Sequence, residues 1–155
     1  EKENGENEPE ALEEGSGSAS DAELADSTEF FAWYDDGDNL FEVGETPIFG
    51  TSTDKQAATI TLKNKTYALA DAIAGEAYKA GETSYIAIQW CAGNMKVDLS
   101  TAEITCDPTT LGNDAQTDSF SVDIGFRAVP SEDNKKFTCI KKETKCESSD
   151  CLKSS

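Results

Sequence analysis

The chain has 155 residues, and its 31 acidic residues against 13 basic ones give a formal net charge of −18 at pH 7. This length fits one domain with a modest core. The charge disfavours nucleic acid or an anionic membrane as a partner, because phosphate groups would repel it. No apolar run approaches the ~20 residues that a membrane span needs, so we expect none.

Histidine is absent from the sequence. The commonest general base and the commonest zinc ligand are therefore both missing, and neither a Ser-His-Asp arrangement nor an H-E-x-x-H site can form. The carboxylates of Asp118 and Asp123 could serve a glycosidase, but they occupy a predicted solvent-facing strand and its lead-in, where charges are common. We expect no enzyme. The chain opens on Glu1 without Met, which is typical of a processed or trimmed product.

Residues 1–26 form an acidic polar extension around a Gly-Ser-Gly-Ser centre. They hold too little apolar area to offset their ordering entropy, so we expect a solvated linker. From residue 27 the composition changes to that of β-strands, and strands are expected at 29–34, 46–49 and 57–62. One short helix is expected within 65–77, because Leu69, Ile73 and Ala77 recur at spacing four. A turn is expected at 80–82.

Two later segments alternate strictly. In 83–90, Ile86, Ile88 and Trp90 share one face. In 119–129, apolar residues occupy every second position from Phe120 to Ala128, which predicts a half-buried strand of an antiparallel sheet.

Short strands are expected between these segments, at 96–99 and 102–106. Residues 140–155 turn polar again and form a tail rich in Cys and Lys. The predicted fold is an all-β, antiparallel β-sandwich over residues 27–139 with one short helical insertion.

An acidic loop separates the first two predicted strands. Its carboxylates would repel one another without a cation, and oxygen-rich loops of this kind suit calcium, which tolerates irregular geometry. Gly37 and Gly44 allow the chain to turn around an ion. An EF-hand would need flanking helices, and here both flanks are predicted strands; a solvated acidic turn is the alternative. The candidate ligands are Asp35, Asp36, Asp38, the Leu40 carbonyl, Glu42 and Glu45.

The cysteines indicate disulfides in an oxidising compartment, because none lies in a CxxC pair. A hairpin between Cys91 and Cys106 would place these two side by side, so we expect that bridge. Cys139 is expected to pair with Cys146 or Cys151, and the odd number leaves one thiol over. Asn64 begins the sequon Asn-Lys-Thr, a possible glycosylation site if the protein is secreted.

Three stretches resemble the TasA/camelysin family of secreted proteins, within a likeness that spans most of residues 3–139. They are W-Y-D-D-G-D-N-L-F-E-V-G-E with P-I-F-G after it, A-G-E-T-S-Y-I-A-I-Q-W-C, and G-N-D-A-Q-T-D-S-F-S-V-D-I-G-F-R-A-V from Gly112 to Val129. The opening E-N-G-E-N-E-P-E is similar to a polar connector of the family's long members. Family members normally begin with an F-x-D-T-E-like segment and several strands that the given sequence does not show before Glu1. We expect either that the chain is the latter part of a longer member or that the amino-terminal half lies elsewhere.

The resemblance implies a jelly-roll-like sandwich, secretion to the cell surface, and a filament or biofilm-matrix subunit. In family filaments the strand of one subunit completes the sheet of the next, a form of β-strand addition. The expected partners are therefore copies of the chain or a related subunit, with calcium in the loop held first by Asp35 or Asp36. The alternatives are a surface binding or adhesion module containing Trp90 or Tyr85, and a camelysin-like peptidase, for which the chain has no histidine.

Overall fold

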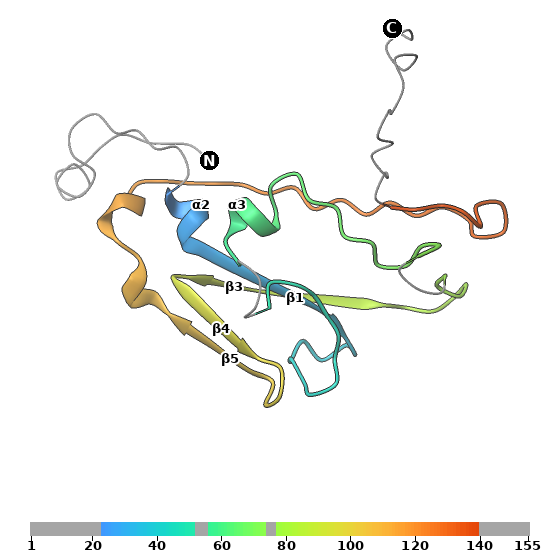
Figure 1. Ribbon diagram of the computed structural model, residues 1–155, viewed down its shortest axis with the longest axis horizontal. Helices are drawn as coiled ribbons and strands as arrows, with labels where there is room; N and C mark the ends of the chain where they lie inside the picture. The colour runs from blue at the N-terminus through green and yellow to red at the C-terminus, as the bar shows by residue number, and fades with distance from the viewer. Residues whose placement is uncertain (1–22, 52–55, 74–76, 140–155) are drawn as a thin grey trace, which may run out of the picture. The chain divides into compact units, whose positions relative to one another are not determined.

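The computed structural model describes residues 23–51, 56–73 and 77–139. These residues form short helices and antiparallel strands, an all-β fold (Figure 1). The chain divides into two units, Glu1–Lys65 with Ala80–Arg127 and Thr66–Lys79 with Ala128–Ser155. The elements are α2 (Glu23–Ser27), β1 (Thr28–Asp35), β2 (Pro47–Phe49), α3 (Ala58–Thr61), β3 (Tyr85–Ala92), β4 (Asn94–Asp98), β5 (Glu103–Asp107), and the 3₁₀ turns η1 (Pro108–Thr110) and η2 (Asn113–Ala115).

Strand β1 is the centre of a three-stranded sheet of order β2-β1-β3. It pairs with β3 without interruption from Thr28 opposite Ala92 to Asp35 opposite Tyr85. The strands predicted at 29–34, 46–49 and 83–90 are confirmed. The pairing arises from the aromatic run of β1, because such side chains favour a pleated, half-buried backbone.

The core lies on one face of this sheet, against the β4–β5 hairpin. Phe31 and Trp33 are almost fully buried there, and their rings stack with centroids 5.2 Å apart. Phe41, from the acidic loop, meets both rings edge-on. The cluster is completed by Ala87, Cys91, Met95 and Val97.

The expected hairpin and disulfide are both present. β4 pairs with β5 in the predicted region, and Cys91 of β3 is bonded to Cys106 of β5, with their Cα atoms 5.7 Å apart. The bond links the two sheets and closes a 15-residue separation, which contributes about 3 kcal/mol in the chain-entropy model. Gly93 makes the corner between β3 and β4 at φ +123°, where a Cβ would lie 2.3 Å from the Asp107 carbonyl oxygen.

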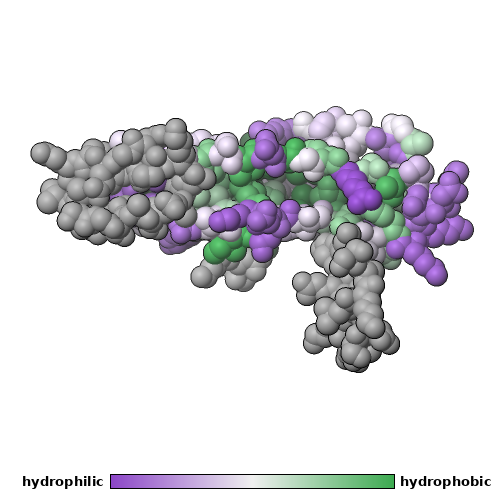
Figure 2. All heavy atoms as spheres, turned by 90° about the horizontal axis from the view of Figure 1, so that it is seen from above, coloured by the Kyte–Doolittle hydropathy of each residue, from purple (hydrophilic) through white to green (hydrophobic). Residues whose placement is uncertain are grey.

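Strand β3 buries the face that carries its small side chains and exposes the face that carries its large apolar side chains. Ala87 and Cys91 point into the core, whereas Trp90 is 63% exposed and Ile88 is 39% exposed. On the face drawn in Figure 2, hydrophobic residues (green) do reach the surface. The alternation in the sequence is therefore correct, but the sheet covers the side with small side chains.

The strand predicted at 57–62 is wrong, because these residues form the helix α3. Ala57 makes only an isolated bridge to Glu29. The amides of Thr61 and Leu62 then donate to the Ala57 and Ala58 carbonyls, both at 2.9 Å. Gln56 O already accepts from Phe30 N at 2.8 Å, so the edge of β1 is occupied one residue earlier and the chain turns away.

The helix predicted within 65–77 is also wrong for the described part of that range, which forms turns and bends. Two backbone amides of this range donate to acceptors other than the carbonyl four residues earlier, which an α-helix would require. Ala72 N donates to Phe137 O at 2.9 Å, and Ile73 N donates to the Asp71 carboxylate at 2.7 Å. The turn at 80–82 is confirmed at Ala80 and Gly81.

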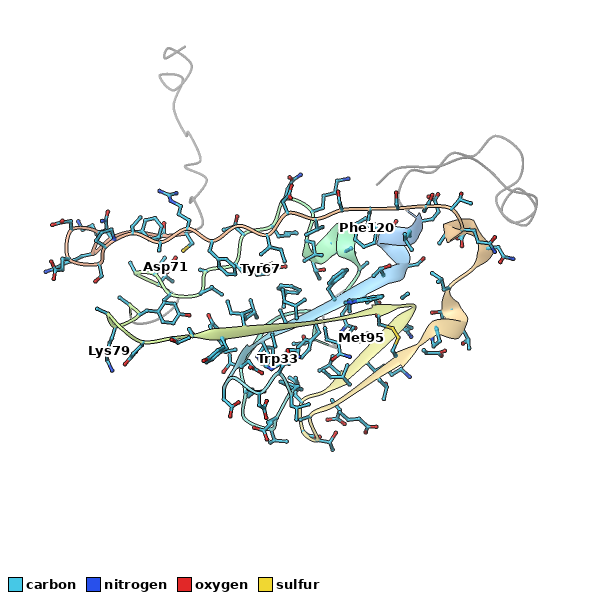
Figure 3. All side chains as sticks on the ribbon, turned by 180° about the vertical axis from the view of Figure 1, so that it is seen from behind. Trp33, Tyr67, Asp71, Lys79, Met95 and Phe120 are labelled. Atoms are coloured by element: carbon cyan, nitrogen blue, oxygen red, sulfur yellow. A yellow bond between two sulfur atoms is a disulfide. The ribbon has the colours of Figure 1, made fainter. Side chains whose placement is uncertain are left out.

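The strand predicted at 119–129 does not form in the described chain: apart from Ser119, which makes a single bridge, no residue of the range belongs to a sheet. The segment is extended, and residues 121–126 make no hydrogen bond to any described residue. Phe120 packs edge-on against Phe30 with ring centroids 6.4 Å apart (Figure 3 labels Phe120). Beyond it, Val122, Ile124 and Phe126 are 44%, 60% and 75% exposed.

Of the outer expected segments, 140–155 lies outside the described residues, and of 1–26 only residues 23–26 are described, as part of α2. No helix in the described ranges is long and apolar enough to cross a membrane. The described strands form sheets of order β2-β1-β3 and β4-β5, which do not by themselves make a jelly roll.

We predict that Gly50→Ala destabilises the fold by about 3 kcal/mol or more. Gly50 has φ +80°, and a Cβ there would lie 2.0 Å from the Phe30 carbonyl oxygen and 2.9 Å from the Phe31 Cα. Gly81→Ala is the matched control, because Gly81 has φ +85° but an added Cβ would meet nothing within 4 Å. Its loss should be about 1 kcal/mol, from backbone strain alone. Urea unfolding measures both, and equal losses would contradict the role of the close approach.

Candidate metal site in the acidic loop

The acidic loop runs from the end of β1 to the start of β2. Its two ends are joined by a hydrogen bond from Tyr34 N to Thr46 O at 2.9 Å. Gly37 has φ +117° and Asn39 has φ 63°, so the chain turns sharply inside the loop. Phe41 anchors the loop by packing on the core aromatics. The loop is therefore folded against the sheet at both ends and at one internal residue.

Asp35 organises the first half of the loop. Its Oδ2 accepts hydrogen bonds from Gly37 N at 2.9 Å and from Asn39 N at 3.2 Å. Its Oδ1 accepts from the buried indole of Trp33, Nε1 to Oδ1 at 3.3 Å. A buried Trp usually needs a partner for its N–H, so this contact ties the loop directly to the core.

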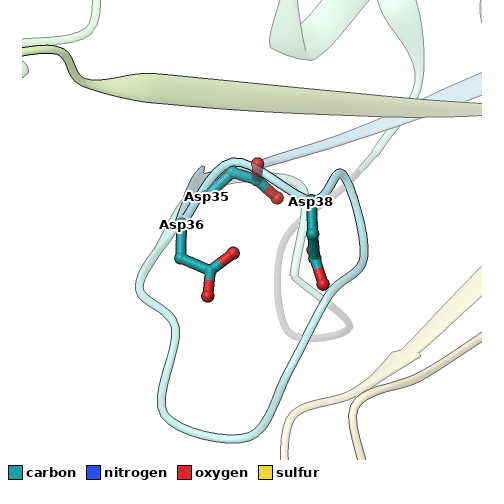
Figure 4. A group of neighbouring side chains, drawn as sticks. All are labelled: Asp35, Asp36 and Asp38. Carbon is teal, nitrogen blue, oxygen red and sulfur yellow. The ribbon is translucent and has the colours of Figure 1, made fainter.

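Three carboxylates converge in the loop, those of Asp35, Asp36 and Asp38 (Figure 4). Each offers an oxygen, and these oxygens lie within 4.8 Å of one another. Two oxygens bound to one calcium ion can be at most about 5 Å apart, because Ca–O distances are about 2.3–2.6 Å. The spacing therefore fits a single calcium ion held by the three predicted aspartates.

The other predicted ligands lie outside this cluster of three. Glu45 braces the loop instead: its Oε1 accepts from Asp36 N at 3.2 Å and its Oε2 from Glu42 N at 2.8 Å. The Glu42 carboxylate has no partner in the described chain. Leu40 donates its N–H to Asp38 Oδ1 at 2.8 Å, and its side chain is exposed.

Solvent reaches most of this cluster. Asp36 and Asp38 are exposed and Asp35 is half-buried. Exposed carboxylates are hydrated, so their mutual repulsion is screened and the loop does not require an ion in order to fold. The three carboxylates are near enough to one another to hold a hard cation, and the hydrogen bonds of the loop also account for its shape without one.

The remaining predicted site residues are dispersed. Cys139 has a free thiol in the structure, and its backbone N donates to Asp71 Oδ2 at 2.8 Å. The bridge from Cys139 to Cys146 or Cys151 stays a prediction, because it falls on residues outside the described ranges. Cys146 and Cys151 lie outside the described residues. Asn64 is exposed, with φ 56°, as a glycosylation acceptor would have to be.

Two carboxylates of the hairpin cap turns. The Ser100 hydroxyl and the Ser100 N–H lower the pKa of Asp98 below its usual value, and the Thr109 hydroxyl and N–H do the same to the pKa of Asp107. Both groups are fully exposed. Hydrogen bonds that favour the charged form keep them ionised to a lower pH than usual, which suits turn capping and points to no chemistry.

The expectation that Asp118 faces solvent is wrong. Both of its carboxylate oxygens are inaccessible to solvent and have no hydrogen-bond donor among the described residues, and the same holds for Asp114 Oδ1. Sequence alternation missed this pair because Asp118 precedes the alternating segment and follows a 3₁₀ turn that no periodicity marks. Asp123, by contrast, is exposed as predicted.

Comparison with protein-family models, with curated proteins and with solved structures finds no match to this chain.

We predict that Glu45→Ala destabilises the protein by about 1 kcal/mol, because two loop amides lose their acceptor. Glu42→Ala is the control: it removes the same charge from the same loop, but its carboxylate has no partner in the described chain. It should change stability by less than about 0.5 kcal/mol. Urea unfolding in a calcium-free buffer gives both values, and a larger loss for Glu42→Ala would refute the brace.

Proposed function

We propose that the chain is an extracellular structural protein, a subunit that assembles into a surface filament or biofilm matrix by strand exchange. The observation that carries this proposal is the extended segment 120–127. It has the side-chain alternation of a strand, no hydrogen bond to a described residue at 121–126, and exposed apolar side chains on one face.

The segment has the properties of an open sheet edge. Free backbone N–H and C=O groups in an extended chain are a template for pairing with another strand. Burying its three exposed apolar side chains would favour such pairing through the hydrophobic effect. The incoming strand would complete a jelly-roll-like sandwich, the fold that the resemblance to the TasA/camelysin family implies. A copy of the chain or a related subunit would supply it.

The rest of the proposal draws on the sequence and on the disulfide. The Cys91–Cys106 bond suits an oxidising, secretory environment. The absence of histidine from the sequence favours a non-enzymatic role over a camelysin-like peptidase. A calcium ion held by Asp35, Asp36 and Asp38 would stabilise the subunit, because the three carboxylates meet only in the folded loop.

A binding or adhesion module is the second candidate, favoured by one observation. Trp90 is 63% exposed on β3, with Ile88 beside it on the same face. Exposed tryptophans are enriched at recognition sites. Tyr85 points to the opposite face of the strand, so it does not extend this patch. A protein that stays monomeric while Trp90→Ala abolishes glycan or protein binding would favour this function over assembly.

We predict that Ile124→Ser/Phe126→Ser prevents assembly while leaving the monomer folded, because both side chains are exposed in the monomer. Ile73→Ser is the control, since Ile73 is 71% exposed but lies outside the segment. Sedimentation velocity and negative-stain microscopy at increasing protein concentration, with calcium, follow assembly. Circular dichroism checks the fold. A wild-type protein that stays monomeric at high concentration would end the assembly proposal.

A second pair of variants separates strand pairing from simple hydrophobic adhesion. Gly125→Pro removes a backbone donor in the middle of the segment, whereas Gly125→Ala keeps it, and a Cβ at Gly125 meets nothing within 4 Å. Only the proline should block assembly. If both variants assembled equally well, the segment would not pair as a strand.

For the loop we predict that calcium slows amide hydrogen exchange at residues 36–42 and raises the melting temperature, and that chelation reverses both. An ion bound only by the folded state stabilises it by about 2.7 kcal/mol at 100 times its Kd. Asp38→Ala should abolish the local protection. A melting curve and loop exchange rates that chelator leaves unchanged would refute the calcium site.

A further inference from the structure

The outer edge of β3 is an open strand edge in the described part of the chain. β3 pairs with β1 on one side and with no described strand on the other. Phe30 N donates to Gln56 O at 2.8 Å, on the side of β1 that faces away from β3. Tyr34 N does the same to Thr46 O at 2.9 Å. Because backbone groups alternate sides along a strand, the odd-numbered residues of β1 and β3 make the ladder between the two strands.

Ile86, Ile88 and Trp90 therefore direct their backbone N–H and C=O groups outward from β3. Their amides make no hydrogen bond to a described residue. The same three residues carry the large apolar side chains of the strand, and Trp90 is 63% exposed and Ile88 39% exposed. The edge thus offers both unpaired backbone groups and apolar side chains to one incoming strand.

The other described strands have features that discourage pairing with another chain. β2 has three residues and begins with Pro47. β4 and β5 carry charged residues along their length: Lys96, Asp98, Glu103 and Asp107. Short strands, proline and charge are the usual means by which proteins protect their sheet edges. β3 has eight residues and none of these features, which is typical of an edge that pairs with a partner.

We propose that the outer edge of β3 binds segment 120–127 of a second copy of the chain, antiparallel, with Ile124 opposite Ile88. This assignment rests on the proposed function and names the surface that accepts the segment. The segment is extended, and its residues 121–126 make no hydrogen bond to a described residue. Pairing would therefore satisfy the free backbone groups of both partners at once.

The register follows from the side chains. With Ile124 opposite Ile88, Val122 lies opposite Trp90 and Phe126 lies opposite Ile86. All six apolar side chains then share one face of the enlarged sheet, where they contact one another across the strands. A slip by one residue would instead place a charged residue and a glycine of the segment in that row, so the apolar pattern selects this register.

Charge also favours this occupant. In a chain of net charge −18, most contacts between two copies bring like charges together. β3 has no charged residue, and the segment carries one acid, Asp123, and one base, Arg127. The register places Asp123 opposite Gln89, whose amide can donate to a carboxylate. It places Arg127 opposite the exposed ring of Tyr85, a pairing that suits a guanidinium.

A complementation experiment tests whether these two different surfaces bind each other. Ile124→Ser/Phe126→Ser disables the segment, and Ile88→Pro removes an outward N–H of β3 without removing a hydrogen bond to β1. Each variant alone should stay monomeric. Their equimolar mixture should form dimers, because one chain keeps the edge and the other keeps the segment. Sedimentation velocity measures the dimers, and circular dichroism checks folding. Ile88→Ala keeps the N–H, so this control should still assemble alone.

The outcomes distinguish the β3 surface from assembly itself. Wild-type protein that stays monomeric at high concentration would contradict the proposed function, and the β3 surface with it. Wild-type protein that assembles, while the mixture of variants stays monomeric, would overturn only the assignment to β3. Ile88→Pro that assembles as the wild type does would have the same consequence.

A disulfide crosslink covers the case in which Ile88→Pro does not fold. Opposite residues of a hydrogen-bonded antiparallel pair have Cα atoms about 5.5 Å apart, within reach of a disulfide. Ile88→Cys mixed with Ile124→Cys should therefore give a linked peptide pair, identified by mass spectrometry after mild oxidation. Its yield should be at least about tenfold higher than with Gln89→Cys, whose side chain points to the opposite face. A main product that links two Ile88→Cys chains at residue 88 would overturn the assignment to the segment.

Discussion

The uninterrupted pairing of β1 with β3 is the interaction on which the other features depend. It places Phe31 and Trp33 on one face, where they form the core with the β4–β5 hairpin. It also sets the position of Cys91, so that the disulfide can reach Cys106. Through the Trp33 indole it reaches Asp35 and the acidic loop. A sheet with only three strands has little other means of holding these parts together, so the aromatic run of β1 determines most of the fold.

The molecule carries many carboxylates, and the role of each depends on its exposure to solvent and on its hydrogen-bond donors. Asp98 and Asp107 are exposed and cap turns. Glu45 uses its two oxygens on loop amides. Asp35, Asp36 and Asp38 are close enough to share an ion but remain hydrated. Among the described residues, only Asp114 and Asp118 have carboxylate oxygens that are shielded from water and lack a hydrogen-bond donor.

The extended segment 120–127 connects structure to the proposed function. It begins at Phe120, which is anchored on Phe30, and then exposes three apolar side chains in succession. Exposed apolar side chains on an extended backbone are costly in a monomer, and residues 121–126 make no hydrogen bond to the described residues. A second strand would satisfy both requirements at once. Together with the exposed Trp90 on β3, this segment is what supports the assembly proposed above.

Local sequence determined β1, β2, β3 and the hairpin, because aromatic content, alternation and turn residues act between neighbours in the chain. It also determined the Cys91–Cys106 bond, since a hairpin brings the two cysteines together. The three aspartates of the loop lie near one another in space because they are close in sequence. Tertiary structure alone decided the rest. Residues 57–62 became a helix because Gln56 already occupied the edge of β1. Residues 65–73 lost their predicted helix to contacts with Asp71 and Phe137. Three further features depend on which distant segments pack nearby, and a local sequence pattern does not encode such packing. They are the strand pairing of residues 119–129, the face of β3 that is buried, and the solvent exposure of Asp118.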